Sequence, residues 1–230
     1  MGTELLGFEV ALYNLLRVGP NTPSLTPPEL WPAILTLADR EHVAPLVHAA
    51  IDASGAAVPD SVRQVLAQSY RRAGTACADA YAQLAEVLRA LHRAGVDPVL
   101  LKGAALARFT YADAALRPFG DLDILVRPEH VEAAHHALRG AGYTIAGDRP
   151  SAVDITWRHA RGYADAAGRR IPVDLHWRYD GYPLLTADNY AGVFARAHPV
   201  DVDGEPALIP APEDMLLALG IHFARDLWYG

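Results

Sequence analysis

The feature that most constrains this chain lies between residues 99 and 126, where two apolar runs flank an alanine-rich helical segment. The first run turns into the helix at Lys102-Gly103, and the second carries Asp121 and Asp123 at its start. Side chains two positions apart on a strand point to the same face. We therefore expect these two carboxylates to stand together at the edge of a strand, with the apolar residues between and after them facing the core.

Two carboxylates held side by side restrict the chemistry of the site. Like charges a few ångströms apart disfavour joint ionisation unless a cation compensates them. Oxygen ligands on a rigid strand suit a hard divalent metal, and Mg2+ before any other. The alternative is a polar turn that leads into a strand, because Asp-x-Asp by itself is a weak signal.

Three sequence blocks carry a family resemblance when they are taken together and in order. They are LLKGAAL at residues 100–106, LRPFGDLDILV at 116–126 and VDLHW at 173–177. The chain resembles the bacterial family usually labelled uncharacterised nucleotidyltransferase, within the DNA polymerase β superfamily. The resemblance implies an α/β (α+β) fold, in which a nucleotidyltransferase core with a mixed β-sheet follows an N-terminal helical region and precedes a C-terminal helix.

The third block adds candidate site residues. By alternation along the expected strand 171–179, Asp174 and His176 share one face. The resemblance implies that Asp174 completes a catalytic triad with Asp121 and Asp123, and that the three carboxylates hold two Mg2+ ions. The alternative for Asp174 is an exposed strand carboxylate. His176 either borders the substrate site or supports a carboxylate through a hydrogen bond.

The turn after the first apolar run is a candidate phosphate site. Backbone N–H groups at the start of a helix, beside a glycine that allows close approach, bind anions, so Lys102 and Gly103 are expected to steady nucleotide phosphates. The wider superfamily usually has a serine after the glycine, whereas Ala104 and Ala105 follow here and supply no hydroxyl. The alternative is a tight turn with an exposed lysine. Arg117 is expected either to grip a phosphate or to neutralise the acidic cluster.

Apolar spacing divides the chain into three regions. We expect an N-terminal helical region over 1–94, the nucleotidyltransferase core over 95–200, and a strand turn and helix over 201–230 that is a candidate start of a longer helical tail. The expected helices of the first two regions span residues 4–18, 31–37, 43–51, 62–94, 104–111 and 131–141.

Turn residues predict where elements begin and end. Thr26 is the expected cap of the second helix, a break is expected near Gly74, and Gly95 ends the long helix. The expected strands are 99–101, 121–126 and 143–146, a hairpin of 155–163 with 171–179, and a second hairpin over 200–208. Pro210–Asp214 starts the last helix, whose expected core stripe is Met215, Leu216, Leu219 and Phe223.

Composition excludes several classes of protein. Hydrophobic residues make up 51% of the 230 residues and charged residues 20%, which is typical of an ordered globular protein. A net charge of -7 argues against a surface for long nucleic acid. The single cysteine, Cys77, excludes an intramolecular disulfide and is expected to be buried. No apolar run is long enough to span a membrane, so we expect a cytoplasmic protein without a membrane partner.

The resemblance implies transfer of a nucleoside monophosphate from a nucleoside triphosphate such as ATP to a hydroxyl or similar group on a small molecule, protein or peptide. Two other classes stay open. One is a catalytically inactive descendant of the fold that binds a nucleotide or partner, favoured by the missing serine. The other is a metal-dependent hydrolase that uses the aspartates with His159, His176 or His222.

Overall fold

The computed structural model describes residues 10–12, 16, 26–146, 160–178 and 187–229. It contains two compact units, one formed by Met1–Ala78 with Ala107–Pro118 and the other by Asp79–Leu106 with Phe119–Gly230. The expected division of the chain into the regions 1–94, 95–200 and 201–230 stays a prediction, because compact units do not show which segments fold independently as domains. In the part of the chain that is described, no helix has both the length and the apolar character needed to cross a membrane.

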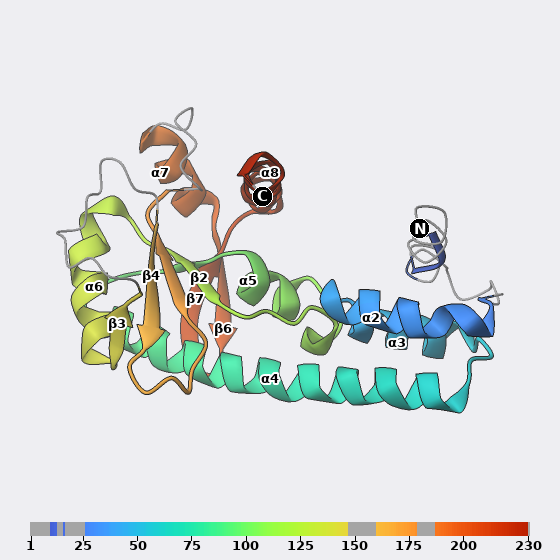
Figure 1. Ribbon diagram of the computed structural model, residues 1–230. Helices are drawn as coiled ribbons and strands as arrows, with labels where there is room; N and C mark the ends of the chain where they lie inside the picture. Colours follow the sequence, from blue (N-terminus) through green and yellow to red (C-terminus); the bar gives the residue numbers. More distant parts are fainter. Residues whose placement is uncertain (1–9, 13–15, 17–25, 147–159, 179–186, 230) are drawn as a thin grey trace. The chain divides into compact units, whose positions relative to one another are not determined.

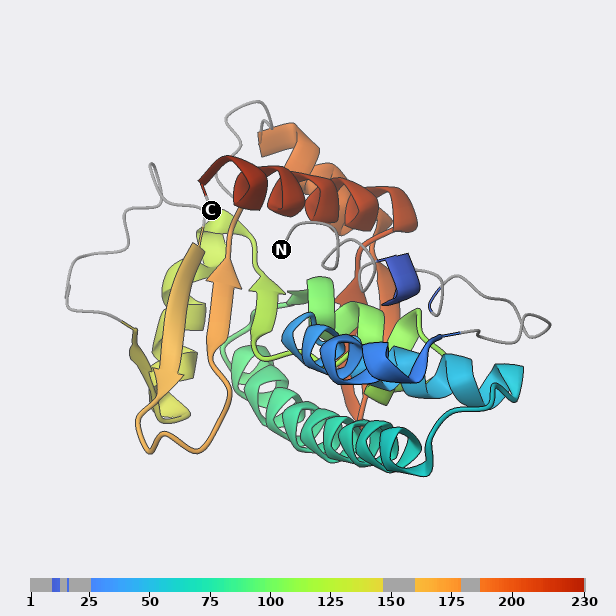
Figure 2. The ribbon, with the colours of Figure 1, turned by 45° about the vertical axis from the view of Figure 1, so that its right-hand side comes forward.

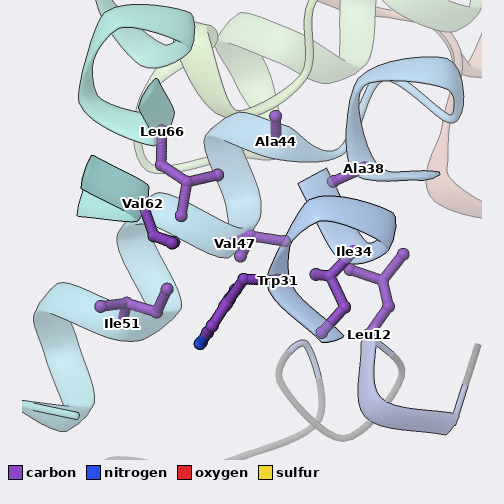
Figure 3. Close-up of a cluster of buried hydrophobic side chains, with 9 residues drawn as sticks. All are labelled: Leu12, Trp31, Ile34, Ala38, Ala44, Val47, Ile51, Val62 and Leu66. Atoms are coloured by element: carbon purple, nitrogen blue, oxygen red, sulfur yellow. The ribbon is translucent and has the colours of Figure 1, made fainter. Parts of the chain in front are cut away.

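The first unit is helical around its own apolar core. Its elements are η1 (Pro28–Leu30), α2 (Trp31–Arg40), α3 (Ala44–Ser54), the first part of α4 (Asp60–Arg93) and η2 (Ala114–Leu116). Trp31 and Ile34 of α2 face Val47 and Ile51 of α3, and Leu66 of α4 closes the cluster (Figure 3). The apolar stripes expected over 31–37 and 43–51 therefore do contribute to one core, whereas the expected helix over 4–18 lies mostly outside the described residues.

Two expectations about helix ends are wrong. Thr26 does not cap the second helix: the cap of η1 is Pro27, and no side chain makes the capping hydrogen bond there. Gly74 does not interrupt the long helix, since α4 runs unbroken through it. Gly95 is confirmed as the stop, because its φ of 73° is a left-handed conformation that glycine adopts without strain.

The second unit is built on a mixed sheet. In the described chain the sheet has 7 strands in the order β3-β4-β5-β2-β1-β7-β6. The strands are β1 (Val99–Leu100), β2 (Leu122–Leu125), β3 (Tyr143–Ile145), β4 (Ala160–Asp165), β5 (Val173–His176), β6 (His198–Val202) and β7 (Glu205–Ile209). The pairs β2–β5 and β1–β7 are parallel, whereas the other neighbours are antiparallel. The mixed α/β class expected from the sequence is therefore confirmed.

Helices cover both faces of this sheet. The helices are α5 (Lys102–Phe109), α6 (Val131–Gly140), α7 (Ala187–Arg196) and α8 (Pro212–Tyr229), with η3 (Pro128–His130) before α6. Tyr163, on one face of β4, shares a 3.0 Å hydrogen bond between its hydroxyl and Nδ1 of His135 in α6. Leu125, on the opposite face of β2, packs with Phe194 of α7 and Ile221 of α8. Figures 1 and 2 show α7 and α8 near each other, above the strands in both views.

One buried glutamine ties α4 to the strand that carries Asp174. The side-chain amide of Gln83 donates to the Ile171 carbonyl over 2.8 Å and to the Tyr143 hydroxyl over 2.7 Å. Its side-chain oxygen accepts a hydrogen bond from the Ile171 N–H over 3.1 Å. The backbone entering β5 is thereby fixed in register against the helix.

Both hairpins form: β5 is shorter than the expected strand 171–179, whereas β6 and β7 together extend beyond the expected 200–208. β4 and β5 pair antiparallel around a turn at residues 166–169, although the expected strand residues 155–159 and 179 lie outside the described residues. β6 and β7 pair around the expected Asp203-Gly204 turn.

The expected core stripe of the last helix is partly wrong. Met215 is buried, but Leu216 is 72% exposed and Phe223 is 65% exposed. The buried face is set instead by Asp214, Ala218 and Ile221. Asp214 faces inward because Arg196 of α7 donates two hydrogen bonds to its carboxylate, of 2.7 and 3.0 Å. The buried side of α8 therefore includes the polar residue Asp214, although apolar residues occur on several sides of this helix.

Candidate metal and nucleotide site

Strand register brings the candidate acidic residues together. β2 and β5 are parallel neighbours, and Asp123 pairs directly with Asp174. Register partners on adjacent strands point to the same face, so both carboxylates lie on one face of the sheet. Ligand atoms of Asp123, Asp174 and His176 all lie within 4.8 Å of one another. Asp123 lies 51 positions before Asp174 along the chain, and yet both belong to one compact donor group.

Asp123 is the centre of this group. It is 3% exposed, and its Oδ1 accepts hydrogen bonds from Lys102 Nζ over 2.9 Å and from His176 Nε2 over 2.8 Å. Burial favours the neutral carboxyl, but the hydrogen bond from His176 and the charges of His176 and Lys102 outweigh it, so the pKa of Asp123 lies below its ordinary value. Asp123 is therefore held as an anion.

Asp121 experiences the opposite balance. It is partly buried just before β2, two positions before Asp123. Burial, followed by the negative charges of Asp123 and Asp174, raises the pKa of Asp121 above its ordinary value, although Lys102 and His176 oppose the shift. A carboxylate that neighbouring carboxylates repel gains most from a bound cation. Asp121 is outside the compact donor group, and its role as a metal ligand stays a prediction.

The helix at the Lys102-Gly103 turn begins two residues earlier than expected. Helix α5 begins at Lys102 itself, whose φ of 45° is unusual for a residue with a side chain. This conformation accompanies the contact between Lys102 Nζ and Asp123, and the Lys102 side chain is only 14% exposed. The alternative of an exposed lysine is therefore wrong, while phosphate binding by Lys102 stays a prediction.

Gly103 has a packing role that the sequence did not indicate. A Cβ atom on Gly103 would lie 2.5 Å from Phe119 Cβ, closer than any real contact. Phe119 in turn packs edge-on against Tyr81, whose hydroxyl donates to the Ala104 carbonyl over 2.8 Å. The absent side chain lets α5 seat against this aromatic pair. A phosphate contact from the Gly103 backbone stays a prediction.

The other candidates have different positions. Arg117 belongs to the first compact unit and donates a 2.8 Å hydrogen bond to the Pro118 carbonyl, so its contact with phosphate stays a prediction. His176 is 3% exposed and contacts Asp123 directly, as the supporting alternative expects. His222 is in α8, and His159 lies outside the described residues. Sequence reasoning missed Gly162, which pairs with Asp174 from β4; a glycine inside a strand was the available signal.

Comparisons with known proteins give one family. The family described as uncharacterised nucleotidyltransferase matches residues 27–230. No curated protein sequence matches the chain significantly. Among solved structures, the chain is similar to the solution structure of the antibiotic-resistance factor ANT(2'')-Ia, at 11% identity and a TM-score of 0.39, over 59% of this chain and 67% of that one. The family match spans most of the sequence, and the protein belongs to the uncharacterised nucleotidyltransferase family.

Proposed function

We propose that the protein transfers a nucleoside monophosphate from a nucleoside triphosphate to a hydroxyl or similar group on a small molecule, protein or peptide. The observation that carries this proposal is the direct pairing of Asp123 with Asp174, which gathers carboxylate oxygens into one donor group on the sheet of a family member. Family membership gives the reaction class, and the acceptor and the base of the nucleotide are part of the proposal.

The donor atoms suit a hard divalent cation. Asp123 and Asp174 offer carboxylate oxygens, the ligands that Mg2+ prefers, and we assign Asp121 as the third. The imidazole of His176 is a poorer Mg2+ ligand and already donates to Asp123, so we assign it as the support that orients that carboxylate. Bound Mg2+, two ions in this proposal, would neutralise charge that develops on the phosphates during transfer.

The reaction requires few groups from the protein. The acceptor oxygen attacks the α-phosphorus, the bond from that phosphorus to the bridging oxygen of the β-phosphate breaks, and pyrophosphate leaves. Asp174 takes the proton of the attacking hydroxyl in this scheme, because it is partly exposed on the site face whereas Asp123 is buried and bonded to Lys102 and His176. Lys102 and the Gly103 N–H hold the phosphates, and their position at a helix start favours anions.

The direct test uses each nucleoside triphosphate labelled at the α-phosphate. The purified protein is incubated with the nucleotide and Mg2+, with EDTA in a parallel sample, and with candidate hydroxyl and amine acceptors or none. We expect pyrophosphate release and a labelled acceptor or labelled protein only where Mg2+ is present. Release that is equal in EDTA would contradict the proposal.

The inactive binding protein is the second candidate. Ala104 and Ala105 are 1% and 2% exposed and supply no hydroxyl at the turn where the wider superfamily usually has a serine. Saturable nucleotide binding without pyrophosphate release, across all acceptors and nucleotides, would favour this candidate.

A further inference from the structure

A single row of residues crosses three strands at the candidate site. Asp123 of β2 pairs with Asp174 of β5, and Asp174 pairs on its other side with Gly162 of β4. Since register partners share a face, the position without a side chain lies directly beside the Asp174 carboxylate. Residues of the same face occupy the next row, where Ala160 pairs with His176.

The space over Gly162 is filled by the carboxylate itself. A Cβ atom on Gly162 would lie 3.1 Å from Asp174 Oδ1 and 3.6 Å from Ala146 Cβ. The first distance is tighter than nearly all real Cβ contacts, so the Asp174 carboxylate would have to move by a few tenths of an ångström. Ala146 makes ordinary contact on the other side, and its N–H donates to the Gly162 carbonyl over 3.0 Å, which fixes the backbone there.

The backbone gives no other reason for this glycine. Gly162 is not among the residues of the described chain with a left-handed φ, so an L side chain is compatible with its conformation. Glycine inside a strand weakens that strand because it adds conformational entropy to the unfolded chain and offers nothing to pack. The compensating feature next to Gly162 is the placement of the Asp174 carboxylate.

We propose that Gly162 is a positioning residue, which leaves open the space where the Asp174 carboxylate stands so that this carboxylate can bind a cation together with Asp123. The inference rests on the proposed function, since it takes these carboxylates as cation ligands. Mg2+ and Mn2+ require ligand oxygens at closely defined positions, so a displacement of a few tenths of an ångström at one ligand reduces affinity.

The test measures Mn2+ binding by the full chain together with its thermal unfolding. The variants are Gly162→Ala, Asp174→Asn, the double variant, and Ala164→Val as a control on the same face of β4. We expect Gly162→Ala to weaken Mn2+ binding about 10-fold, the size typical of changes around a metal ligand. Its Tm should equal or exceed that of the unsubstituted protein, because alanine weakens a strand less than glycine does. Ala164→Val should bind Mn2+ normally.

The double variant decides whether Gly162 acts through Asp174. In the Asp174→Asn background, Gly162→Ala should cause no further loss of Mn2+ affinity. Unchanged affinity in Gly162→Ala, or a loss that comes with a lower Tm and persists in the Asp174→Asn background, would overturn the positioning role while leaving the proposed function intact. Normal Mn2+ binding by Asp174→Asn would instead overturn the cation site and both proposals.

Discussion

At the residue scale, the pKa values of Asp123 and Asp121 shift in opposite directions although the two carboxylates are close in the chain. Asp123 has two hydrogen-bond donors on one oxygen, whereas Asp121 is partly buried beside like charges. The result is a cluster that keeps the Asp123 carboxylate ionised and makes the ionisation of Asp121 costly.

Lys102 should contribute measurably to stability through its contact with Asp123. Lys102→Met removes the 2.9 Å charged hydrogen bond and leaves the buried carboxylate with His176. We expect the free energy of unfolding to fall by about 2 kcal/mol in metal-free buffer, the usual size for a hydrogen bond between charged groups. Urea denaturation measures it, with Arg93→Met at the exposed end of α4 as the control. Equal stability of Lys102→Met and the unsubstituted protein would contradict the contact.

Asp121→Asn should stabilise the metal-free protein at neutral pH. The pKa of Asp121 is raised in the folded state, so its ionised form costs stability above that pKa. The gain in the free energy of unfolding should be largest near pH 7, shrink as the pH falls through the raised pKa, and vanish below the ordinary pKa, where the carboxyl is protonated in both states. Urea denaturation at neutral and acid pH measures the difference. A variant less stable at pH 7 would contradict the electrostatic account.

The sequence predicted part of the site at this scale. Strand alternation indicated that Asp121 lies near Asp123, whose charge Asp121 does experience, and family resemblance supplied Asp174. The contact of Lys102 with Asp123 could not be predicted from the sequence, because it accompanies a left-handed backbone conformation that lysine rarely adopts. The role of Gly162 could not be predicted either, since it depends on which residue of β5 lies opposite this glycine.

At the element scale, helical glycines provide a matched test of packing. Gly103 of α5 has Phe119 within 2.5 Å of where a Cβ would lie, whereas Gly74 of α4 has only Ala115 Cβ at 3.7 Å, an ordinary contact. Both positions gain helix propensity when alanine is introduced. The two substitutions therefore differ only in the room available for the added Cβ atom.

Gly103→Ala should destabilise the protein and Gly74→Ala should stabilise it. Overpacking against Phe119 costs about 1 to 3 kcal/mol, which exceeds the propensity gain. At Gly74 the gain of about 0.5 to 1 kcal/mol is not opposed. Urea denaturation measures both, and Phe119→Ala combined with Gly103→Ala should cost less than the sum of the single changes. A destabilised Gly74→Ala, or a neutral Gly103→Ala, would contradict this packing.

Elements with one apolar face were predicted well, and elements without one were not. The α4 residues Leu84, Val87, Leu88 and Leu91 are fully buried, as their spacing indicates. In α8, apolar residues occur on several sides, so hydrophobicity did not identify the buried face, and Leu216 and Phe223 were assigned wrongly to the core. The ion pair of Asp214 with Arg196, which sets that face, joins two helices and has no local signature.

At the scale of the whole molecule, the order of the strands in the sheet brings the separate sequence motifs together at one site. Neighbouring hairpins were readable from turn residues, but the parallel pairing of β2 with β5 joins segments about fifty residues apart. Local periodicity carries no information about such a pairing, and the family resemblance supplied only the expectation that Asp174 joins Asp121 and Asp123. The family resemblance implied the fold class, whereas it did not give the strand order.

The central claim is that the paired carboxylates of β2 and β5 perform nucleotidyl transfer. The measurement that tests it most directly is pyrophosphate release, with Mg2+ and the preferred nucleotide, by the unsubstituted protein, Asp123→Asn, Asp174→Asn and Asp97→Asn. Asp97 is an exposed aspartate before β1 and serves as the matched control. We predict that the first two variants lose at least about 100-fold in rate while unfolding cooperatively, a loss typical of removing charge stabilisation at a reacting centre, and that Asp97→Asn retains full activity. Full activity in a folded Asp123→Asn or Asp174→Asn variant would contradict the claim.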